Sequence, residues 1–253
     1  RNRLTSLGMT KEDEDLTKAV SNLDAVTTDL QGAVMKTRMQ PIKKVFGRFP
    51  RVVRDLARSL HKDIKLILEG EETDLDKKLV EALADPLVHL VRNSVDHGIE
   101  EPDVREAKGK GREGTVILSA SQEGDHILLT IRDDGAGMNA DKLKEIAIER
   151  GVLDEDAANR MSDKDAFSLI FAPGFSTKTE ISEVSGRGVG MDVVKNAVQK
   201  LGGRITVTSN EGEGSSFAII LPLTLAVMDG FVVSVSDQTM VVPIASILET
   251  VSA

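Results

Sequence analysis

The sequence predicts an α+β protein in which helices cover one face of a mixed β-sheet. Pairs of apolar strand patterns are separated by short glycine-containing turns, and amphipathic helical patterns lie between those pairs. A leucine repeat near the N-terminus predicts a separate helical segment. We therefore expect a helical region at 1–47, an α/β sandwich domain at 48–223, and the first strands of a further β domain at 224–253.

The first part is typical of two helices joined by a turn. Residues 1–7 have the pattern of a helix end closed by Gly8, and a long helix follows over 10–46, which Pro41 should end or kink. Leucines recur in it every seven residues, at Leu16, Leu23 and Leu30. One hairpin cannot bury such a seam, whereas dimerisation into a four-helix bundle can. We expect a homodimer through these helices; the alternative is a helix packed on its own globular domain.

Apolar periodicity predicts the elements of the other two parts in order. In the second part we expect strands over 64–68, 115–122, 126–132, 204–209 and 216–221, and helices over 74–95 with a break at Pro86, 140–150, 163–171 and 190–201. The third part has strand patterns over 226–235 and 239–243. Thirty residues cannot bury much core alone, so we expect these strands to belong to a truncated domain.

Composition excludes several classes of protein. With 32 Lys and Arg against 41 Asp and Glu the net charge is −9, which argues against a protein that binds nucleic acid by neutralising phosphates. The chain has no Cys and no long apolar run, so we expect a cytoplasmic protein without membrane insertion or thiolate metal sites. Because it begins at Arg1 and stops at Ala253 in mid-pattern, we expect a fragment of a longer chain.

The helix that ends near Gly98 carries a polar face opposite an apolar stripe. Helical spacing brings five polar side chains roughly onto that face: His89, Arg92, Asn93, Asp96 and His97. Such a face suits a cleft, although an ordinary surface helix is the alternative.

Three glycine clusters follow. Residues 133–138, Asp-Asp-Gly-Ala-Gly-Met, come directly after a strand, where an Asp can accept a hydrogen bond from an exocyclic amine; the alternative is an ordinary turn. Residues 186–191, Gly-Arg-Gly-Val-Gly-Met, open a helix, whose N-terminus favours phosphate. Their spacing fits neither a Rossmann fingerprint nor a Walker loop. Residues 212–217 form a hairpin turn.

The long connection over 139–185 predicts a lid between the first two clusters. It contains phenylalanines and then a polar run over 176–180. We expect Phe167, Phe171 and Phe175 to fix one end of the lid, with at least two of the three being plain core residues.

In order, these features resemble the N, G1, F, G2 and G3 boxes of the GHKL ATP-binding fold. Histidine kinases, type II topoisomerases, Hsp90-type chaperones and mismatch-repair ATPases share this fold. The hydrolytic branches carry Glu four residues before the Asn, whereas this chain has His89 before Asn93. Residues 89–100, 171–177 and 185–194 closely resemble chemotaxis histidine kinases of the CheA type. Residues 221–225 are similar to the junction with their CheW-like regulatory domain.

The resemblance implies ATP and Mg²⁺ as cofactors and assigns roles to residues. Asn93 would bind Mg²⁺, His89 would lie near the γ-phosphate and orient the nucleophile, and Asp133 would bind the adenine amine. The remaining nucleotide-binding residues it implies are Arg92, Asp96, His97, Gly135, Gly137, Lys142, Ser176, Thr177, Gly186, Gly188, Gly190, Met191 and Ser215. Ser215 replaces the Thr usual in the last box and keeps its hydroxyl.

The implied activity is phosphoryl transfer from ATP to a His on a separate phosphotransfer domain, usually across the dimer. Implied partners are a CheW-like adaptor, chemoreceptors and response regulators downstream of that domain. We expect none of the four histidines here, His61 and His126 included, to be the phosphoacceptor. The alternatives are a hydrolytic ATPase of the same superfamily and a non-catalytic nucleotide-binding scaffold.

Overall fold

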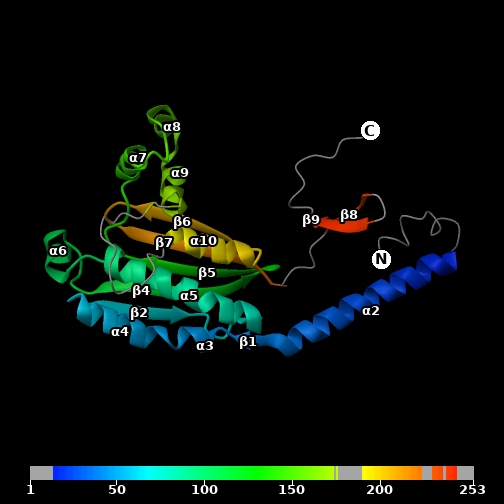
Figure 1. Ribbon diagram of the computed structural model, residues 1–253. Helices are drawn as coiled ribbons and strands as arrows, with labels where there is room; N and C mark the ends of the chain where they lie inside the picture. Colours follow the sequence, from blue (N-terminus) through cyan, green and yellow to red (C-terminus); the bar gives the residue numbers. More distant parts are fainter. Residues whose placement is uncertain (1–13, 174, 176–189, 224–229, 236–237, 244–253) are drawn as a thin grey trace.

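The computed structural model describes residues 14–173, 175, 190–223, 230–235 and 238–243 (Figure 1). A long N-terminal helix leads into a domain built on a five-stranded β-sheet with helices, and two further strands follow the domain. Among the described residues, no helix is long and apolar enough to cross a membrane.

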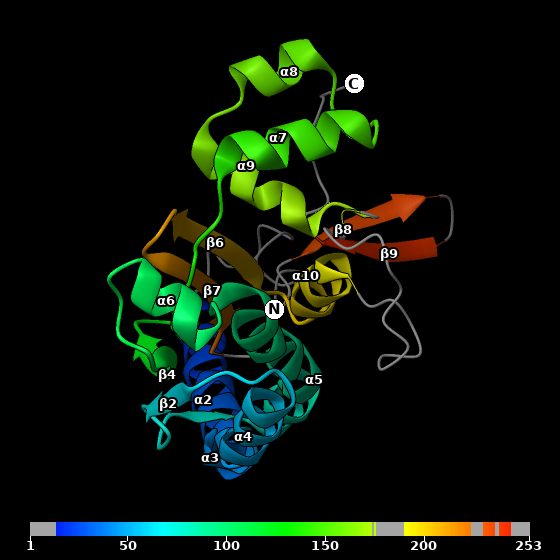
Figure 2. The same cartoon turned by 90° about the vertical axis from the view of Figure 1, so that its left-hand side faces the viewer.

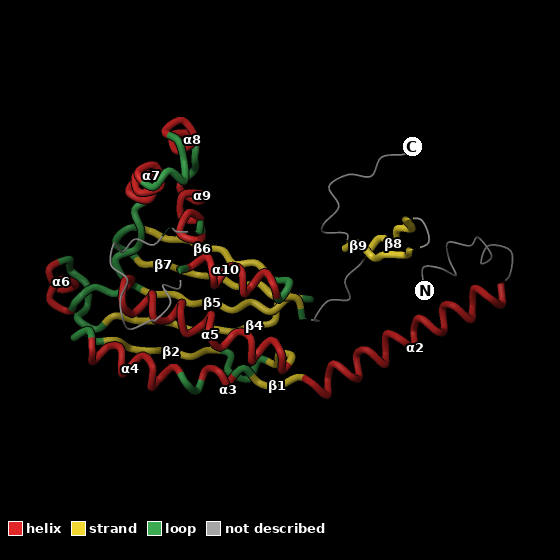
Figure 3. Tube along the Cα trace, in the orientation of Figure 1, coloured by secondary structure: helices red, strands yellow, loops and turns green. Residues whose placement is uncertain are grey.

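The long helix α2 (Glu14–Arg38) ends earlier than predicted. Residues 39–46 do not continue it: they form strand β1 (Met39–Pro41) and the short helix α3 (Lys43–Phe46), as the tube in Figure 3 shows. Proline disfavours helical geometry in the residue before it, which explains an end upstream of Pro41. Strand β1 pairs antiparallel with β3 (Asp74–Asp76). Residues 1–13 lie outside the described part, so the preceding helix stays a prediction.

The predicted mixed sheet is confirmed. Its order is β2-β4-β5-β7-β6, with β2 and β4 parallel and all other neighbours antiparallel. The strands are β2 (Ile64–Glu69), β4 (Gly114–Glu123), β5 (His126–Asp133), β6 (Arg204–Asn210) and β7 (Gly214–Pro222). Each lies within about two residues of its predicted range, because alternation of apolar side chains specifies both the strand and its buried face.

Three helices pack on one side of this sheet, as the turned view in Figure 2 shows: α4 (Phe49–Ser59), α5 (Lys77–Asn93) and α10 (Met191–Lys200). Alternate residues of β4, β5 and β7 point into the core between the layers, among them Leu118, Leu129 and Ile219, all fully buried. This layer places the C-terminal end of α5 and the N-terminal end of α10 side by side above the sheet.

The break predicted at Pro86 is wrong. Helix α5 runs without interruption through Pro86, which is itself buried. Proline removes one backbone hydrogen bond, but the fully buried Leu83, Leu87 and Leu90 hold the helix against the core on both sides of it. The irregularity lies further on, where α5 passes into one π-helical turn, η2 (Ser94–Gly98).

The segment predicted as a lid is largely helical where it is described. It contains α7 (Ala140–Glu149), α8 (Glu155–Arg160), α9 (Asp163–Ser168) and the 3₁₀ turn η3 (Leu169–Phe171). Phe167, Phe171 and Phe175 are buried, which confirms their expected core role. The polar run at 176–180 lies outside the described residues. A short helix α6 (Pro102–Ala107) precedes β4, and β8 (Gly230–Val235) pairs with β9 (Gln238–Pro243) as a separate antiparallel hairpin.

Candidate functional site

One end of the site forms where β5 stops at Asp133. This carboxylate is 2% exposed, and its Oδ1 accepts the backbone N–H groups of Gly135 at 3.1 Å and Ser215 at 3.3 Å. Burial raises the pKa of Asp133, and the two backbone N–H groups act in the opposite direction. An acceptor held this firmly at the end of a strand is suited to one directed hydrogen bond from a ligand.

Glycines let three chain segments converge on Asp133. A Cβ on Gly98 would lie 2.9 Å from the Asp133 carboxylate, and one on Gly135 would lie 2.0 Å from the carbonyl oxygen of Gly98. Gly214 has φ +115°, and a Cβ there would lie 2.0 Å from the carbonyl oxygen of Asp133. The third glycine cluster, which by itself is a hairpin turn but resembles the G3 box, therefore lies directly against Asp133. Gly137 belongs to the same turn, with φ +68°.

A serine pair supports the turn from the side of β6 and β7. The hydroxyls of Ser209 and Ser215 lie 3.0 Å apart, and Ser209 Oγ accepts the backbone N–H of Met138 at 2.8 Å. Ser215 thus contributes through its backbone N–H and its hydroxyl together. Ser209 was missed by sequence reasoning, because its contact partner lies 71 residues away.

Sequence reasoning also missed a charged cluster that contacts the turn after Asp133. Arg105 is 2% exposed and donates to Glu100 at 3.2 Å and to the Asp134 carboxylate at 3.1 Å. Lys110 Nζ donates to the backbone carbonyl of Gly135 at 2.6 Å. Arg105 and Lys110 both donate to the backbone carbonyl of Asp134, so this buried, paired cluster fixes the path of the main chain directly after Asp133.

The second end of the site lies where α5 and α10 meet. Asn93 Nδ2 donates to Met191 Sδ at 2.8 Å. A thioether sulfur can only accept, so this contact places the amide nitrogen against α10 and leaves the amide oxygen Oδ1 available for a ligand. Gly190 is the residue before the first turn of α10.

Titratable groups surround His89 at this end. Burial, followed by the positive charge of Arg92, lowers the pKa of His89, while Asp192 of α10 acts in the opposite direction. His97 also lowers it, and the Nε2 of His97 lies 3.5 Å from Oδ2 of Asp96. His89 is therefore neutral near pH 7, with one ring nitrogen able to accept a proton or a hydrogen bond.

The structure brings the predicted residues together in two groups, one where the C-terminal part of α5 meets α10 and one where β5 ends at Asp133. His89, Arg92, Asn93, His97, Gly190 and Met191 gather at one, and Asp133, Gly135, Gly137 and Ser215 at the other. Lys142 is an exposed residue of the first turn of α7, and none of its described contacts joins it to either group. Ser176, Thr177, Gly186 and Gly188 lie outside the described residues.

The two other histidines lie apart from both groups. His61 is in the turn between α4 and β2, and His126 is at the start of β5 with its Nδ1 2.5 Å from Asp125.

These residues fit a nucleotide with a magnesium ion. Within the described ranges, no group of three or more acidic, His or Cys side chains could hold a metal. The amide oxygen of Asn93 is an oxygen donor of the kind that Mg²⁺ binds, and this ion also retains waters and binds phosphate oxygens. The buried Asp133 acceptor in its glycine cradle fits the exocyclic amine of a flat base that approaches the backbone closely.

Residues 82–225 match the model of the histidine kinase-, DNA gyrase B-, and HSP90-like ATPase family. The chain belongs to this family. Within it, the chain is 55% identical over 94% of its length to the sensor histidine kinase CheAY of Helicobacter pylori, covering 30% of that protein. It is 46% identical over 99% of its length to the chemotaxis protein CheA of Bacillus subtilis, covering 37% of that protein. The chain thus spans about a third of the length of these relatives.

Among solved structures, the catalytic domain of histidine kinase ThkA aligns over 74% of this chain and 95% of its own, with a TM-score of 0.47 and 14% identity.

Proposed function

We propose that this chain is the dimerisation and ATP-binding core of a chemotaxis protein histidine kinase. It would transfer the γ-phosphoryl group of Mg-ATP to a His on a separate phosphotransfer domain, usually across the dimer. The observation that carries the proposal is that His89 lies one helical turn before Asn93, the position that is Glu in the hydrolytic branches of the family. Extensive identity to CheA proteins supports it.

Each end of the site takes a part in this reaction. Asp133 accepts a hydrogen bond from the adenine amine, and Gly135 and Gly137 leave room for the base against the backbone. Arg92, His97 and the N-terminus of α10 at Gly190 face the phosphates, where positive charge and free backbone N–H groups stabilise the transferring group. Asp96 lies beside His97 and orients it. We assign Lys142, Ser176, Thr177, Gly186 and Gly188 to the same nucleotide from their positions in the sequence motifs.

Mg²⁺ bound through Asn93 Oδ1 would neutralise the phosphate charge. His89 holds the incoming imidazole nucleophile by accepting its N–H, which a neutral ring can do and an imidazolium cannot. Phosphoryl transfer needs chiefly position and charge neutralisation, so this small set of side chains is sufficient.

The direct test uses a separately made phosphotransfer domain that contains the acceptor His. We expect labelled ATP to transfer its phosphoryl group to that domain, and Asn93→Asp to abolish the transfer. ATP hydrolysis at the same rate without an acceptor would support the hydrolytic alternative instead. Failure to bind Mg-ATP at all would support the scaffold alternative.

The homodimer is proposed from α2. Three of its apolar side chains are exposed in the single chain: Leu23 (62%), Val26 (55%) and Leu30 (60%). Leu23 and Leu30 stand seven residues apart, so they share one stripe that a second copy would cover. Sedimentation of the native chain should give a dimer, and Leu23→Glu with Leu30→Glu should give a folded monomer. A native monomer at micromolar concentration would contradict the proposal.

Further partners follow from the likeness to CheA proteins. We propose that residues 224–253 begin a CheW-like domain, and that the complete protein meets a CheW-like adaptor, chemoreceptors and response regulators in the cytoplasm.

A further inference from the structure

A lysine outside all the sequence motifs holds the turn that joins the two ends of the site. Lys62 Nζ donates to the backbone carbonyls of Val95 at 2.9 Å, Asp96 at 2.7 Å and Ile99 at 2.7 Å. A lysine ammonium has three N–H donors, and here there are three carbonyl acceptors, two within the turn and one on the residue that follows it. The lysine lies more than thirty residues before the turn in the sequence.

The turn needs such a donor because of its geometry. The backbone N–H of Ile99 donates to Ser94 at 2.8 Å, the wide spacing of a π-helix, and the chain then leaves the helix. The carbonyls of Val95 and Asp96 would pair with later N–H groups in a continuing helix, so here they need another partner. A cation at a helix C-terminus also interacts favourably with the helix dipole.

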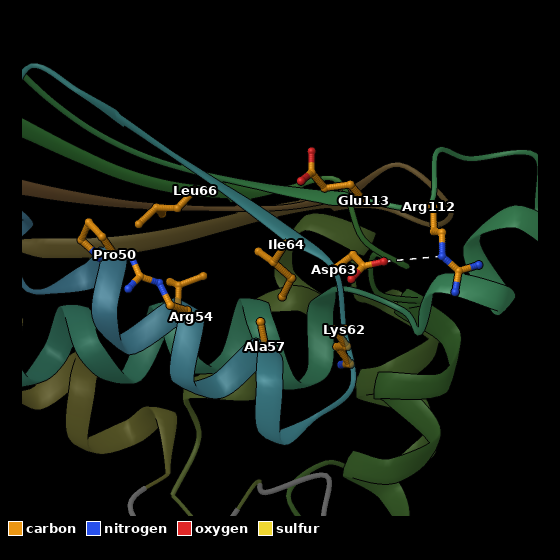
Figure 4. A pocket seen from close by; sticks show the side chains of 10 residues that line it. Pro50, Arg54, Ala57, Lys62, Asp63, Ile64, Leu66, Arg112 and Glu113 are labelled. Atoms are coloured by element: carbon orange, nitrogen blue, oxygen red, sulfur yellow. Dashed lines mark ion pairs between the residues drawn. The ribbon is translucent and has the colours of Figure 1, made fainter.

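The chain between α4 and β2 positions Lys62 next to the π turn. Helix α4 ends at Ser59, and His61 takes φ +53°, the one positive value among the described non-glycine residues. The N–H of Lys62 donates back to Ala57 at 2.9 Å. Lys62 lines a groove between α4 and the edge strand β2, of about 600 Å³, in which Asp63 and Arg112 pair (Figure 4). Neither Asp133 nor Asn93 lines this groove.

The turn connects the residues at the two ends of the site. Asn93 immediately precedes it, and Gly98 closes it. The carbonyl of Gly98 accepts the N–H of Ala136 at 2.8 Å, and the Cα of Gly98 faces the Asp133 carboxylate. The path of five residues therefore sets the distance between the amide of Asn93 and the carboxylate of Asp133.

We propose that Lys62 is a positioning residue for the nucleotide: by binding two carbonyls of the π turn and the carbonyl of Ile99 just after it, Lys62 matches the separation of Asn93 and Asp133 to the length of Mg-ATP. The inference rests on the proposed nucleotide-binding function. Lys62 touches neither the base nor the phosphates. Its effect is on the fit of the whole ligand, so adenosine, which occupies one end alone, should depend on it little.

The experiment compares two ligands by calorimetry: adenosine, and Mg²⁺ with the non-hydrolysable analogue adenylyl-imidodiphosphate. The quantity measured is the ratio of their affinities. Lys62→Met should lower this ratio about tenfold, since hydrogen bonds from a charged donor are among the stronger ones in proteins. Adenosine affinity should change less than about twofold, because the backbone contacts of Gly135 and Ser215 to Asp133 remain.

Two further variants make the result decisive. Lys65→Met removes an exposed lysine of β2 three residues away and should leave the ratio unchanged. Lys62→Arg keeps the charge, but its planar fork cannot converge on three carbonyls, so the ratio should fall about threefold in a folded protein. This variant decides the question if Lys62→Met does not fold.

A native ratio in a folded Lys62 variant, or an equal fall in Lys65→Met, overturns the proposal. A native chain that binds neither ligand removes the proposed function itself, a different result from native binding with an unchanged ratio.

Discussion

The two ends of the site are built from different kinds of contact. At the Asp133 end, most contacts join backbone to backbone or backbone to a buried carboxylate. The glycines there pack so closely that a Cβ on Gly135 or Gly214 would lie only 2.0 Å from a backbone carbonyl oxygen. At the Asn93 end, partly buried side chains of two helices meet, and the amide N–H of Asn93 donates to the sulfur of Met191. The first end leaves no room for adjustment, whereas the second can change by rotation of side chains.

This difference matches what each end binds in the proposed reaction. The adenine base is the same before and after phosphoryl transfer, so a rigid acceptor at Asp133 serves throughout. The phosphates change in charge and number, so side chains that can re-orient suit them. Mutations can distinguish the two ends. Substitutions at the Asp133 end should change the stability of the fold, whereas a substitution at the Asn93 end should change the affinity for the metal ion.

The largest effect is expected from Gly135→Ala. The new Cβ would lie 2.0 Å from the carbonyl oxygen of Gly98 and 2.9 Å from the backbone nitrogen of Ile99, so two backbone segments must separate. We expect a loss of about 3 kcal/mol in the free energy of unfolding, the upper range for overpacking, together with loss of nucleotide binding. Urea denaturation and calorimetry with ATP measure the two quantities.

Gly111→Ala is the matched control. Gly111 lies in the loop before β4, and the nearest atom to a Cβ there is 4.0 Å away. This variant should fold and bind as the native chain does. If Gly135→Ala were as stable as Gly111→Ala, the close approach of Gly98 to the turn would not be a feature of the protein in solution.

A smaller effect is expected from Asp133→Asn, which should raise the stability of the fold at pH 7 and lower the affinity for nucleotide. Burial raises the pKa of Asp133, so the folded state binds its proton more tightly than the unfolded chain does. Native stability is therefore greatest below the unfolded pKa of this carboxyl and falls as pH rises from there through the folded pKa, and this loss is the cost of burying the charged carboxylate. The neutral amide avoids it and keeps an oxygen for the N–H groups of Gly135 and Ser215.

Asp133→Asn should thus unfold at a higher temperature than the native chain at pH 7, with the difference disappearing below the unfolded pKa of the carboxyl. Nucleotide affinity should fall about 100-fold, because a charged acceptor for the adenine amine is replaced by a weaker neutral one. Thermal unfolding across pH and nucleotide titration check the two signs. A variant less stable than native at pH 7 would show that the carboxylate stabilises the fold, contrary to the sign of its pKa shift.

The sequence predicted best what depends on local pattern. Alternating apolar residues located all five strands of the sheet, and the glycine clusters located the Asp133 turn. Contacts between distant segments carry no such pattern, so Lys62, Ser209 and Lys110 were not found. The wrong break at Pro86 has the same origin, because burial of neighbouring leucines decided the helix, and burial is a property of the whole fold.

The smallest effect is expected from Met191→Leu at the adjustable end. Leucine fills nearly the same volume but cannot accept the N–H of Asn93, so the amide is free to rotate and present nitrogen rather than oxygen to the cation. Affinity for Mg²⁺ in the presence of ADP should fall about threefold, as expected for the loss of one weak hydrogen bond, while affinity for adenosine stays native. Titration of Mn²⁺ by paramagnetic resonance measures the cation directly. Unchanged cation affinity in a folded Met191→Leu would mean that the orientation of the Asn93 amide is set by some other contact, and a parallel fall in adenosine affinity would mean that the two ends of the site are not independent.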